Sequence, residues 1–319
     1  TRTTAPAQTM SRHSVAAELP VAFVRNVRGA FGADGARWLA GLPATCRAYA
    51  ERWGLTLGRP YQLTYHYVVA ATRADGTPAV LKLGVPGGVE FGRQVRALRL
   101  VAGDGMARLL AADVAGGAML LERVEPGQRL TPVDETADPA ATEVLLDVMR
   151  RVHRPAPDAD LPTVADWGRG FDRLRARHGG GTGPLPAALV DRAERRYAEL
   201  AGSPAGGPVL LHGDLHHENA LRSDRAGWLA IDPKGVLGEP AFEVGPLLLN
   251  PWPQLLRWPD PARILSRRVD QLADGLAVPA DRVRSWGFAF AALSAAWTDE
   301  DGGGQNAHAL RVAELVSRA

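Results

Sequence analysis

The sequence pattern changes near residue 126, from short strand-like segments to helical stripes. Before that point, residues 61–72 are rich in Tyr, Thr and Val, and a turn joins them to the apolar segment 78–84, which predicts a β-hairpin. Residues 90–102 have helical spacing, and two more short strands follow. Beyond residue 126, apolar residues recur every three or four positions, as in 144–152. We therefore predict an α+β fold with a small antiparallel sheet in the first half and mainly helices in the second.

The length of 319 residues agrees with two lobes, because single hydrophobic cores stop growing beyond roughly 250–300 residues. We predict a first lobe over residues 21–126, with an amphipathic helix at 34–53, and a second lobe over 127–319. Pro43 interrupts that helix and is expected to kink it. Residues 1–20 contain no apolar segment of a secretory signal, and we expect them to form a mobile tail.

Charge and composition exclude several classes of protein. Lys and Arg number 37 against 35 for Asp and Glu, which is too balanced for a dedicated nucleic-acid binder. Cys46 is the only cysteine, so the chain forms no internal disulfide, and we expect a reducing compartment, the cytoplasm. The apolar segment 286–297 has 12 residues, fewer than the roughly 20 that a membrane-spanning helix needs. We expect neither a nucleic-acid nor a membrane partner.

Lysine is rare in this chain, because only Lys82 and Lys234 among the 37 basic residues are lysines. In a chain this rich in Ala, Arg, Gly and Pro, the preference for Arg most simply reflects nucleotide composition. A retained lysine therefore indicates a position that needs a compact ammonium group. Lys82 is the only charge in an apolar strand-like segment. For Lys234 we expect either contact with a phosphate or substrate, or a structural pair with Glu239 or Glu243.

A polar loop follows the apolar segment 209–211 and has the sequence His-Gly-Asp-Leu-His-His-Glu-Asn. It places Asp214 and Asn219 five residues apart, and the chain reaches Asp232 after a second predicted hairpin. A loop after a buried strand and the end of the next hairpin can direct all three side chains to one point. Three oxygen ligands of this kind suit Mg²⁺, which keeps several waters and shares phosphate oxygens. The sequence therefore predicts a site for a magnesium-bound nucleoside triphosphate.

The order of these residues is that of kinase catalytic loops, in which His-x-Asp is followed by Asn and by a later metal-binding Asp. On this interpretation Asp214 accepts the proton of the acceptor hydroxyl, with His212 in a supporting role. Asn219 and Asp232 hold Mg²⁺. No phosphoenzyme is expected, because phosphoryl transfer needs mainly positioning and cations against the phosphate charge.

The nucleotide itself is expected to contact the first lobe. Lys82 is predicted to hold the non-transferred phosphates. The backbone of Glu122 and Val124 can pair with the adenine edge at the connection between the lobes. Thr64 is the small hydroxyl nearest to the expected phosphate-covering loop.

Two other kinds of site are less compatible with the pattern. A zinc site would use His212, His216 and His217, but the segment is predicted to be a loop, so a four-residue histidine spacing does not form one face. A Walker-type loop requires Gly-Lys-Ser/Thr, and neither lysine follows a glycine.

The segment VLLHGDLHHENALRSDRAGWLAIDPKGVLGEPAFEVGPLL resembles the aminoglycoside and hydroxyurea phosphotransferase family, and within it the streptomycin 6-kinase group. The segments GTPAVLKLGVP, AMLLERVEPG and RVHRPAP resemble the family in the same order, so the likeness covers most of residues 34–300. It implies a bilobal, protein-kinase-like fold that uses ATP, or GTP, with Mg²⁺. The implied reaction is phosphorylation of a small-molecule hydroxyl, with the streptomycin 6-hydroxyl as the leading acceptor and antibiotic resistance as the result.

The chain departs from the kinase pattern at two places. Kinases of this type usually pair a helix glutamate with the strand lysine, whereas the aligned position holds Gln94 and the nearest acid is Glu90, one turn earlier. The loop around Thr64 lacks glycine. These departures leave open a nucleotide-binding pseudokinase, while a kinase for hydroxyurea or another natural product is the alternative enzyme. A protein kinase is disfavoured, because no activation segment separates Asp232 from the next motif.

An acceptor site for streptomycin should be acidic, because streptomycin carries two guanidinium groups. Trp297, Asp299 and Glu300 lie at the end of an apolar helix predicted in the second lobe, and we expect them to contact the acceptor. The alternative is a solvated helix end. Glu239 and Glu243 are expected to support the catalytic loop, and His153 is expected to pack in the lobe core.

Overall fold

The computed structural model describes residues 19–132, 134–156, 159–302 and 306–318. Most of the expected tail, residues 1–18, lies outside this range. The chain forms two compact units: Thr1–Gly88 with Leu110–Glu122, and Val89–Leu109 with Arg123–Ala319. The second unit therefore includes the helix α2 (Val89–Val101), which precedes the last strands of the first unit in sequence.

The first unit consists of one long helix and a sheet in which the strand order is β1-β2-β3-β5-β4. The hairpin predicted from the sequence is present and pairs Tyr67 with Leu83 and Thr72 with Pro78. Its first strand starts at Tyr67, and the preceding residues 61–66 are irregular, with a bend over 64–66. The elements are α1 (Val21–Trp53), β1 (Leu55–Pro60), β2 (Tyr67–Arg73), β3 (Pro78–Leu83), β4 (Leu109–Asp113) and β5 (Ala118–Glu122).

Helix α1 begins earlier than its sequence pattern suggested and is broken at a different residue. The backbone leaves helical geometry at Gly32, with φ 53° and ψ −129°, whereas the dihedral angles at Pro43 remain helical. Glycine permits this left-handed conformation, which an L-residue with a side chain rarely adopts. The break lets Phe23 pack against Trp38, with ring centroids 6.2 Å apart.

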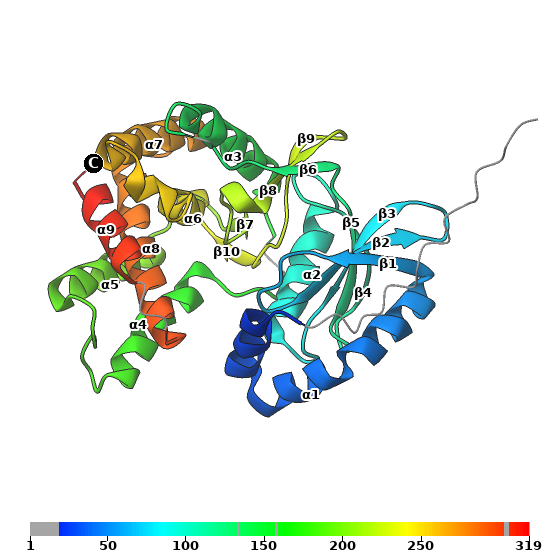
Figure 1. Cartoon of the computed structure of the whole chain (residues 1–319). Helices are drawn as coiled ribbons and strands as arrows, with labels where there is room; N and C mark the ends of the chain where they lie inside the picture. The colour runs from blue at the N-terminus through cyan, green and yellow to red at the C-terminus, as the bar shows by residue number, and fades with distance from the viewer. Residues whose placement is uncertain (1–18, 133, 157–158, 303–305, 319) are drawn as a thin grey trace, which may run out of the picture. The chain divides into compact units, whose positions relative to one another are not determined.

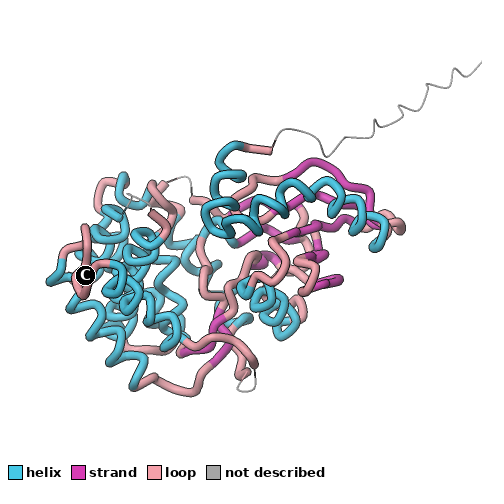
Figure 2. Tube along the Cα trace, turned by 90° about the horizontal axis from the view of Figure 1, so that it is seen from below, coloured by secondary structure: helices cyan, strands magenta, loops and turns pink. Residues whose placement is uncertain are grey.

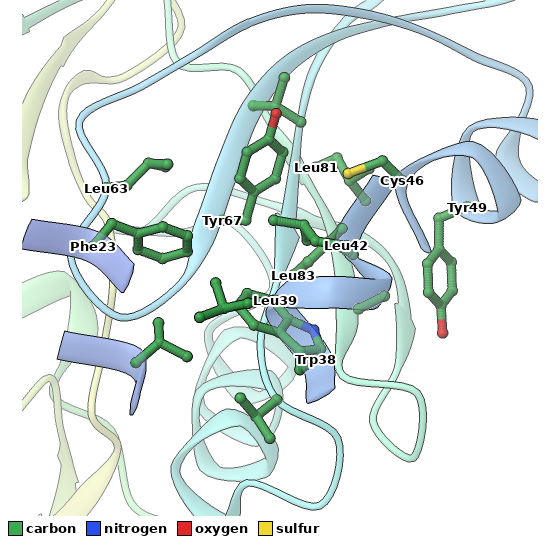
Figure 3. Close-up of a cluster of buried hydrophobic side chains, with 14 residues drawn as sticks. Phe23, Trp38, Leu39, Leu42, Cys46, Tyr49, Leu63, Tyr67, Leu81 and Leu83 are labelled. Carbon is green, nitrogen blue, oxygen red and sulfur yellow. The ribbon is translucent and has the colours of Figure 1, made fainter. Parts of the chain in front are cut away.

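The core of the first unit lies between α1 and the sheet (Figure 3). The helical stripe Trp38, Leu42, Cys46 and Tyr49 faces apolar residues of β2 and β3, among them Leu81. Alternation of buried and exposed positions along β2 places one of its faces on this core. Cys46 is a free, buried thiol, and burial raises its pKa to about 11.

The second unit is mainly helical, as the cyan tube in Figure 2 shows. Its helices after α2 are α3 (Asp138–Val152), α4 (Val164–Arg177), α5 (Ala187–Gly202), α6 (Val244–Leu249), α7 (Pro261–Leu276), α8 (Ala280–Glu300) and α9 (Asn306–Val316). Two small sheets complete it (Figure 1): β6 (Pro126–Arg129), β8 (Ala220–Ser223) and β9 (Gly227–Ala230) in one, and β7 (Val209–Leu211) with β10 (Val236–Gly238) in the other. The predicted second hairpin is thus β8 and β9.

Helix α8 is the centre of the second unit and packs against α4, α5, α6, α7 and α9. It explains the apolar segment 286–297, because nearly all of that segment is buried inside the protein. Phe242 joins α8 to its neighbours through edge-to-face contacts with Trp286, Phe290 and Tyr197, at centroid distances of 5.1, 5.5 and 6.2 Å. None of the helices in the described part of the chain is both long and apolar enough to cross a membrane.

A fully buried ion pair ties α3 to α7. Asp138 and Arg268 are both inaccessible to solvent, and the guanidinium of Arg268 donates to the carboxylate at 2.9 and 2.5 Å. The same guanidinium donates to the backbone oxygens of Leu247 and Asn250 at 2.8 and 2.6 Å, which anchors the end of α6. A buried pair of this kind is tolerated because every charged group has hydrogen-bond partners.

Candidate active site

The polar loop after β7 is held in shape by a buried carboxylate. Glu243 is fully buried, and its two oxygens accept the backbone N–H groups of His212 at 2.6 Å and Gly213 at 2.9 Å. The His212 ring spans the loop: Nδ1 accepts the Asp214 N–H at 3.2 Å, so Nε2 carries the proton and donates to the Ile231 carbonyl at 2.8 Å. Burial lowers the pKa of His212, which keeps this ring neutral.

The glycine of this loop is required by its surroundings. Gly213 has φ 84°, and a Cβ atom there would lie 2.8 Å from the Trp167 ring and 3.2 Å from Cβ of Lys234. Both the backbone conformation and the space exclude a larger residue. The absence of a side chain at Gly213 allows the Trp167 ring and the Cβ atom of Lys234 to pack over the loop.

Asp214, Asn219 and Asp232 are brought together by hydrogen bonds between their segments. The Asn219 amide donates to the Asp214 backbone oxygen at 2.8 Å and to its carboxylate at 3.4 Å. The Ile231 N–H donates to the Asn219 carbonyl at 2.9 Å, which sets the start of the next segment. Asp232 then adopts a left-handed backbone, with φ 57°, so the chain turns sharply at this carboxylate.

The site perturbs the acid–base behaviour of Asp214. Burial raises the pKa of Asp214 to about 6, the charge of Lys234 opposes the rise, and the carboxylates of Glu243 and Asp232 add to it. The side chain still has 38% of its surface accessible. It is therefore a carboxylate, largely ionised at neutral pH, that is basic enough to accept a proton.

The donor set fits a hard cation. Asn219 uses its amide nitrogen on Asp214, which leaves its Oδ1 atom for a cation. The repulsion between Asp214 and Asp232 would be relieved by a positive ion near both. Carboxylate and amide oxygens are the ligands of Mg²⁺ rather than of zinc.

The zinc alternative finds no support in the histidine contacts. The His216 ring contacts the Asn219 amide at 3.2 Å, whereas His217 is buried 3.9 Å from Asp138. Within residues 19–132, 134–156, 159–302 and 306–318, no group of three or more His, Cys, Asp or Glu side chains could hold a metal ion.

A large cavity opens beside Asp214 in the second unit, with a volume of about 1070 Å³. Its walls come from α2, α4, α6, α8 and the segment 160–162, which are distant in sequence. Five basic and four acidic side chains line it, together with an apolar wall. The basic ones are Arg93, Arg96, Arg169, Arg173 and Lys234, the acidic ones Glu90, Asp160, Asp166 and Asp214, and the aromatic ones Trp167, Phe290 and Trp297.

Lys234 has a partner that its sequence neighbourhood did not indicate. Its Nζ atom is 2.5 Å from the Glu90 carboxylate on α2, so the expected pairing with Glu239 or Glu243 is wrong. Glu243 is occupied by the loop backbone, and Glu239 accepts from Arg282, Trp286 and the Ala205 N–H. Glu243 therefore supports the loop as expected, whereas Glu239 anchors α8.

The proposed acceptor residues separate into two groups. Trp297 lines the cavity and packs edge-on against Trp167, at a centroid distance of 5.5 Å. Asp299 and Glu300 do not line it, because Asp299 contacts His178 at 2.8 Å and Glu300 accepts from Arg173 at 2.8 Å. These carboxylates contact Arg173 on α4 and His178 at its end, and they are absent from the cavity lining.

The remaining sequence-predicted residues are divided between the two units. Lys82 is buried on β3, opposite Met119 of β5. Thr64 lies in the bend before β2, and its backbone oxygen accepts from Asn26 at 3.4 Å. Glu122 ends β5 opposite Ala79, and Val124 is buried two residues later in the second unit. His153 packs in the second unit, with its ring 3.7 Å from Glu243.

Several cavity residues were not found from the sequence. The sequence indicated Glu90 only as the acid nearest to Gln94, which holds the position of the helix glutamate of kinases. Trp167, Asp166 and Arg93 belong to no sequence motif. Asp166 caps α4, where hydrogen bonds from Thr163 lower its pKa, as do the charges of Arg169 and Arg93. The local signal was therefore a helix N-terminus, which does not indicate a ligand site.

The fold is that of protein-kinase-like enzymes, as predicted. The crystal structure of aminoglycoside phosphotransferase APH(4)-Ia is similar, with a TM-score of 0.60 at 16% identity, covering 86% of this chain and 98% of that chain. This likeness shows that the chain has the fold of kinase-like phosphotransferases.

Sequence comparison places the chain in a family. A family model described as aminoglycoside/hydroxyurea antibiotic resistance kinase matches residues 56–302. The chain is 35% identical over 298 residues to streptomycin 6-kinase of Streptomyces glaucescens, covering 89% of this chain and 92% of that relative. It is 33% identical over 303 residues to hydroxyurea phosphotransferase of Kitasatospora aureofaciens, covering 92% and 84%. The chain belongs to the aminoglycoside/hydroxyurea antibiotic resistance kinase family and is a phosphotransferase with an alcohol group as acceptor.

Proposed function

We propose that this enzyme transfers the γ-phosphoryl group of ATP to a hydroxyl of an aminoglycoside-type antibiotic, with the 6-hydroxyl of streptomycin as the leading acceptor. The observation that carries the proposal is that Asp214, which is hydrogen-bonded to Asn219 and lies near Asp232, lines a cavity of about 1070 Å³. A cavity of this size admits a multi-ring acceptor. The relatives that are named streptomycin 6-kinase support the choice of acceptor.

Asp214 is the group that acts on the acceptor. Its carboxylate accepts the hydroxyl proton as the acceptor oxygen attacks the γ-phosphorus, and the bond to the β-phosphate breaks with its electron pair leaving on ADP. The buried Glu243 and the neutral His212 fix the loop, so Asp214 stays in one orientation during the transfer.

The nucleotide is assigned to residues of both predicted lobes. Asn219 and Asp232 would hold Mg²⁺, which when bound neutralises phosphate charge. Lys82 would contact the non-transferred phosphates. We further propose that residues 21–126 form the nucleotide-binding lobe, with Thr64 at the phosphates and the backbone of Glu122 and Val124 at the base, and that 127–319 form the catalytic and acceptor lobe. GTP is the alternative nucleotide.

The acceptor is assigned to the cavity walls. Trp167 and Trp297 provide flat apolar faces, and Asp160 and Asp166 provide carboxylates for the guanidinium groups of streptomycin. Glu300 acts indirectly, because it holds Arg173 at the cavity wall. Asp299 orders the same helix end through His178. The balanced charge of the lining favours a second candidate, the small and uncharged acceptor hydroxyurea, and a relative of that name supports it.

A panel assay tests the proposal. The enzyme is incubated with MgATP and streptomycin, other aminoglycosides, hydroxyurea or a peptide, and the products are examined by mass spectrometry for an added phosphate. We expect phosphorylated streptomycin and expect Asp214→Asn to lose transfer by orders of magnitude while nucleotide binding remains. Asp281→Asn, an exposed acid paired with Arg284, is the matched control. Phosphorylation of hydroxyurea alone would select the second candidate, and nucleotide binding without any transfer would indicate a pseudokinase.

A further inference from the structure

Lys234 is fixed at the active-site loop by its backbone. Its N–H donates to the His212 carbonyl at 2.8 Å, and its Cβ lies over Gly213. The side chain lines the same cavity as Asp214. The Lys234 side chain therefore extends from a backbone segment that is hydrogen-bonded to the loop that carries Asp214.

Glu90 holds this ammonium group from the other side. Its Oε1 atom is 2.5 Å from Nζ of Lys234, and the two residues are 144 positions apart in sequence. Both side chains are open to the cavity, with 39% of Lys234 and 49% of Glu90 accessible. An ion pair exposed to this extent contributes little to stability, so fold stability does not explain why the pair is present.

Three of the four other basic side chains of the lining pair with carboxylates other than Asp214. Arg96 pairs with Asp160 at 2.8 Å, Arg169 with Asp166 at 3.2 Å and Arg173 with Glu300 at 2.8 Å. The charge of Lys234, in contrast, acts on Asp214. Lys234 is also one of two lysines among 37 basic residues, and a compact ammonium can approach an oxygen from directions that a planar guanidinium cannot.

We infer that Lys234 is a catalytic residue whose ammonium group hydrogen-bonds a non-bridging oxygen of the phosphoryl group during transfer, and that Glu90 is a positioning residue that aims it. This inference rests on the proposed kinase function. No bond to Lys234 forms or breaks: the acceptor oxygen bonds to phosphorus, the electron pair of the broken bond leaves on ADP, and Asp214 takes the proton. The ammonium stabilises the charge on the equatorial oxygens.

The inference predicts selective loss of affinity for a mimic of the transferring group. Thermal shift and tryptophan fluorescence are used to measure binding of MgADP alone and of MgADP with aluminium fluoride. For the wild type we expect aluminium fluoride to tighten ADP binding at least 10-fold. Lys234→Met should abolish this gain while ADP alone binds within threefold of the wild type. Arg311→Met, which removes an exposed cation paired with Glu314, is the matched control and should keep the gain.

Kinetics and two further variants complete the test. Lys234→Met should lower kcat by 100-fold or more with KM for ATP nearly unchanged, and Glu90→Gln should lower kcat by about 10-fold by releasing the ammonium. Lys234→Arg keeps the charge and covers the case in which the Met variant does not fold. It should retain part of the aluminium fluoride gain.

The outcomes separate this inference from the proposed function. A wild type that neither binds MgADP nor transfers phosphate refutes the kinase proposal itself. A wild type that shows the gain, with folded Lys234→Met or Lys234→Arg showing the full gain and full kcat, refutes the role of Lys234 alone. Equal loss of ADP affinity and of the aluminium fluoride gain also overturns it, because a merely structural lysine would behave in that way.

Discussion

Removing one charge of the buried pair between Asp138 and Arg268 should cost far more than removing both. Both residues are inaccessible to solvent, and Asp138 is the only carboxylate that faces Arg268 in the described structure. Asp138→Asn leaves the guanidinium with the backbone oxygens of Leu247 and Asn250. Loss of one partner of a buried pair costs about 3–5 kcal/mol. That is a large part of the roughly 5–15 kcal/mol that stabilises a typical protein.

The assay is urea denaturation followed by circular dichroism and tryptophan fluorescence. The double variant Asp138→Leu with Arg268→Met removes both charges and keeps much of the volume. We therefore expect its free energy of unfolding to lie within about 2 kcal/mol of that of the wild type. Arg267, which also contacts Asp138, is partly exposed and can turn to water. The reasoning fails if Asp138→Asn costs less than about 1 kcal/mol, or if the double variant is as unstable as the single one.

Four further variants, at Glu243, Gly213 and Asp214, test the loop. Glu243→Ala leaves two buried N–H groups unpaired and should cost about 2–4 kcal/mol of stability and most of kcat. Glu243→Gln retains one acceptor and should lose less stability and less kcat, which thermal melts and kinetics can measure. Gly213→Ala should lose about 1–3 kcal/mol and activity together, because its φ of 84° and its contact with Trp167 exclude a Cβ; a variant as stable and active as the wild type would contradict this. Asp214→Asn in metal-free buffer should raise the melting temperature at pH 8 and less so toward pH 5. The pKa of Asp214 in the folded state, about 6, lies above the usual 3.8, so ionisation at high pH disfavours the folded state. The difference corresponds to about 3 kcal/mol, or roughly 1 kcal/mol after allowance for solvent screening of a side chain that is 38% exposed. A melting temperature that is unchanged or lower at pH 8 would exclude this sign.

The sequence was sufficient for the elements that are defined by local spacing. The hairpin of β2 and β3, the hairpin of β8 and β9 and the loop from His212 to Asn219 are each formed by one continuous segment of the chain. The break at Gly32 was missed because a glycine in an apolar helical stripe carries no distinct periodicity, whereas Pro43 drew attention through its missing N–H.

Partners distant in sequence were not predictable in the same way. Lys234 and Glu90 are 144 positions apart, and Glu300 meets Arg173 across 127 positions. Spacing along the chain indicates which face of a helix is buried, but it does not indicate which charge lies opposite. The segment from Trp297 to Glu300 was therefore interpreted as an acidic binding site, whereas Arg173 of α4 pairs with Glu300.

The loop and the cavity walls are held by different kinds of contact, and this difference has a consequence for specificity. Glu243 is buried and fixes the loop through two backbone hydrogen bonds, so a change there disturbs the chemistry. Asp160 and Asp166 are held by exposed pairs with Arg96 and Arg169, and exposed pairs are weak enough for a guanidinium of an acceptor to replace the arginine. The walls can thus exchange partners, or accept substitutions, without moving Asp214. Under the proposed function, we expect acceptor choice to depend on the walls of the second unit and the phosphoryl-transfer step to depend on the loop.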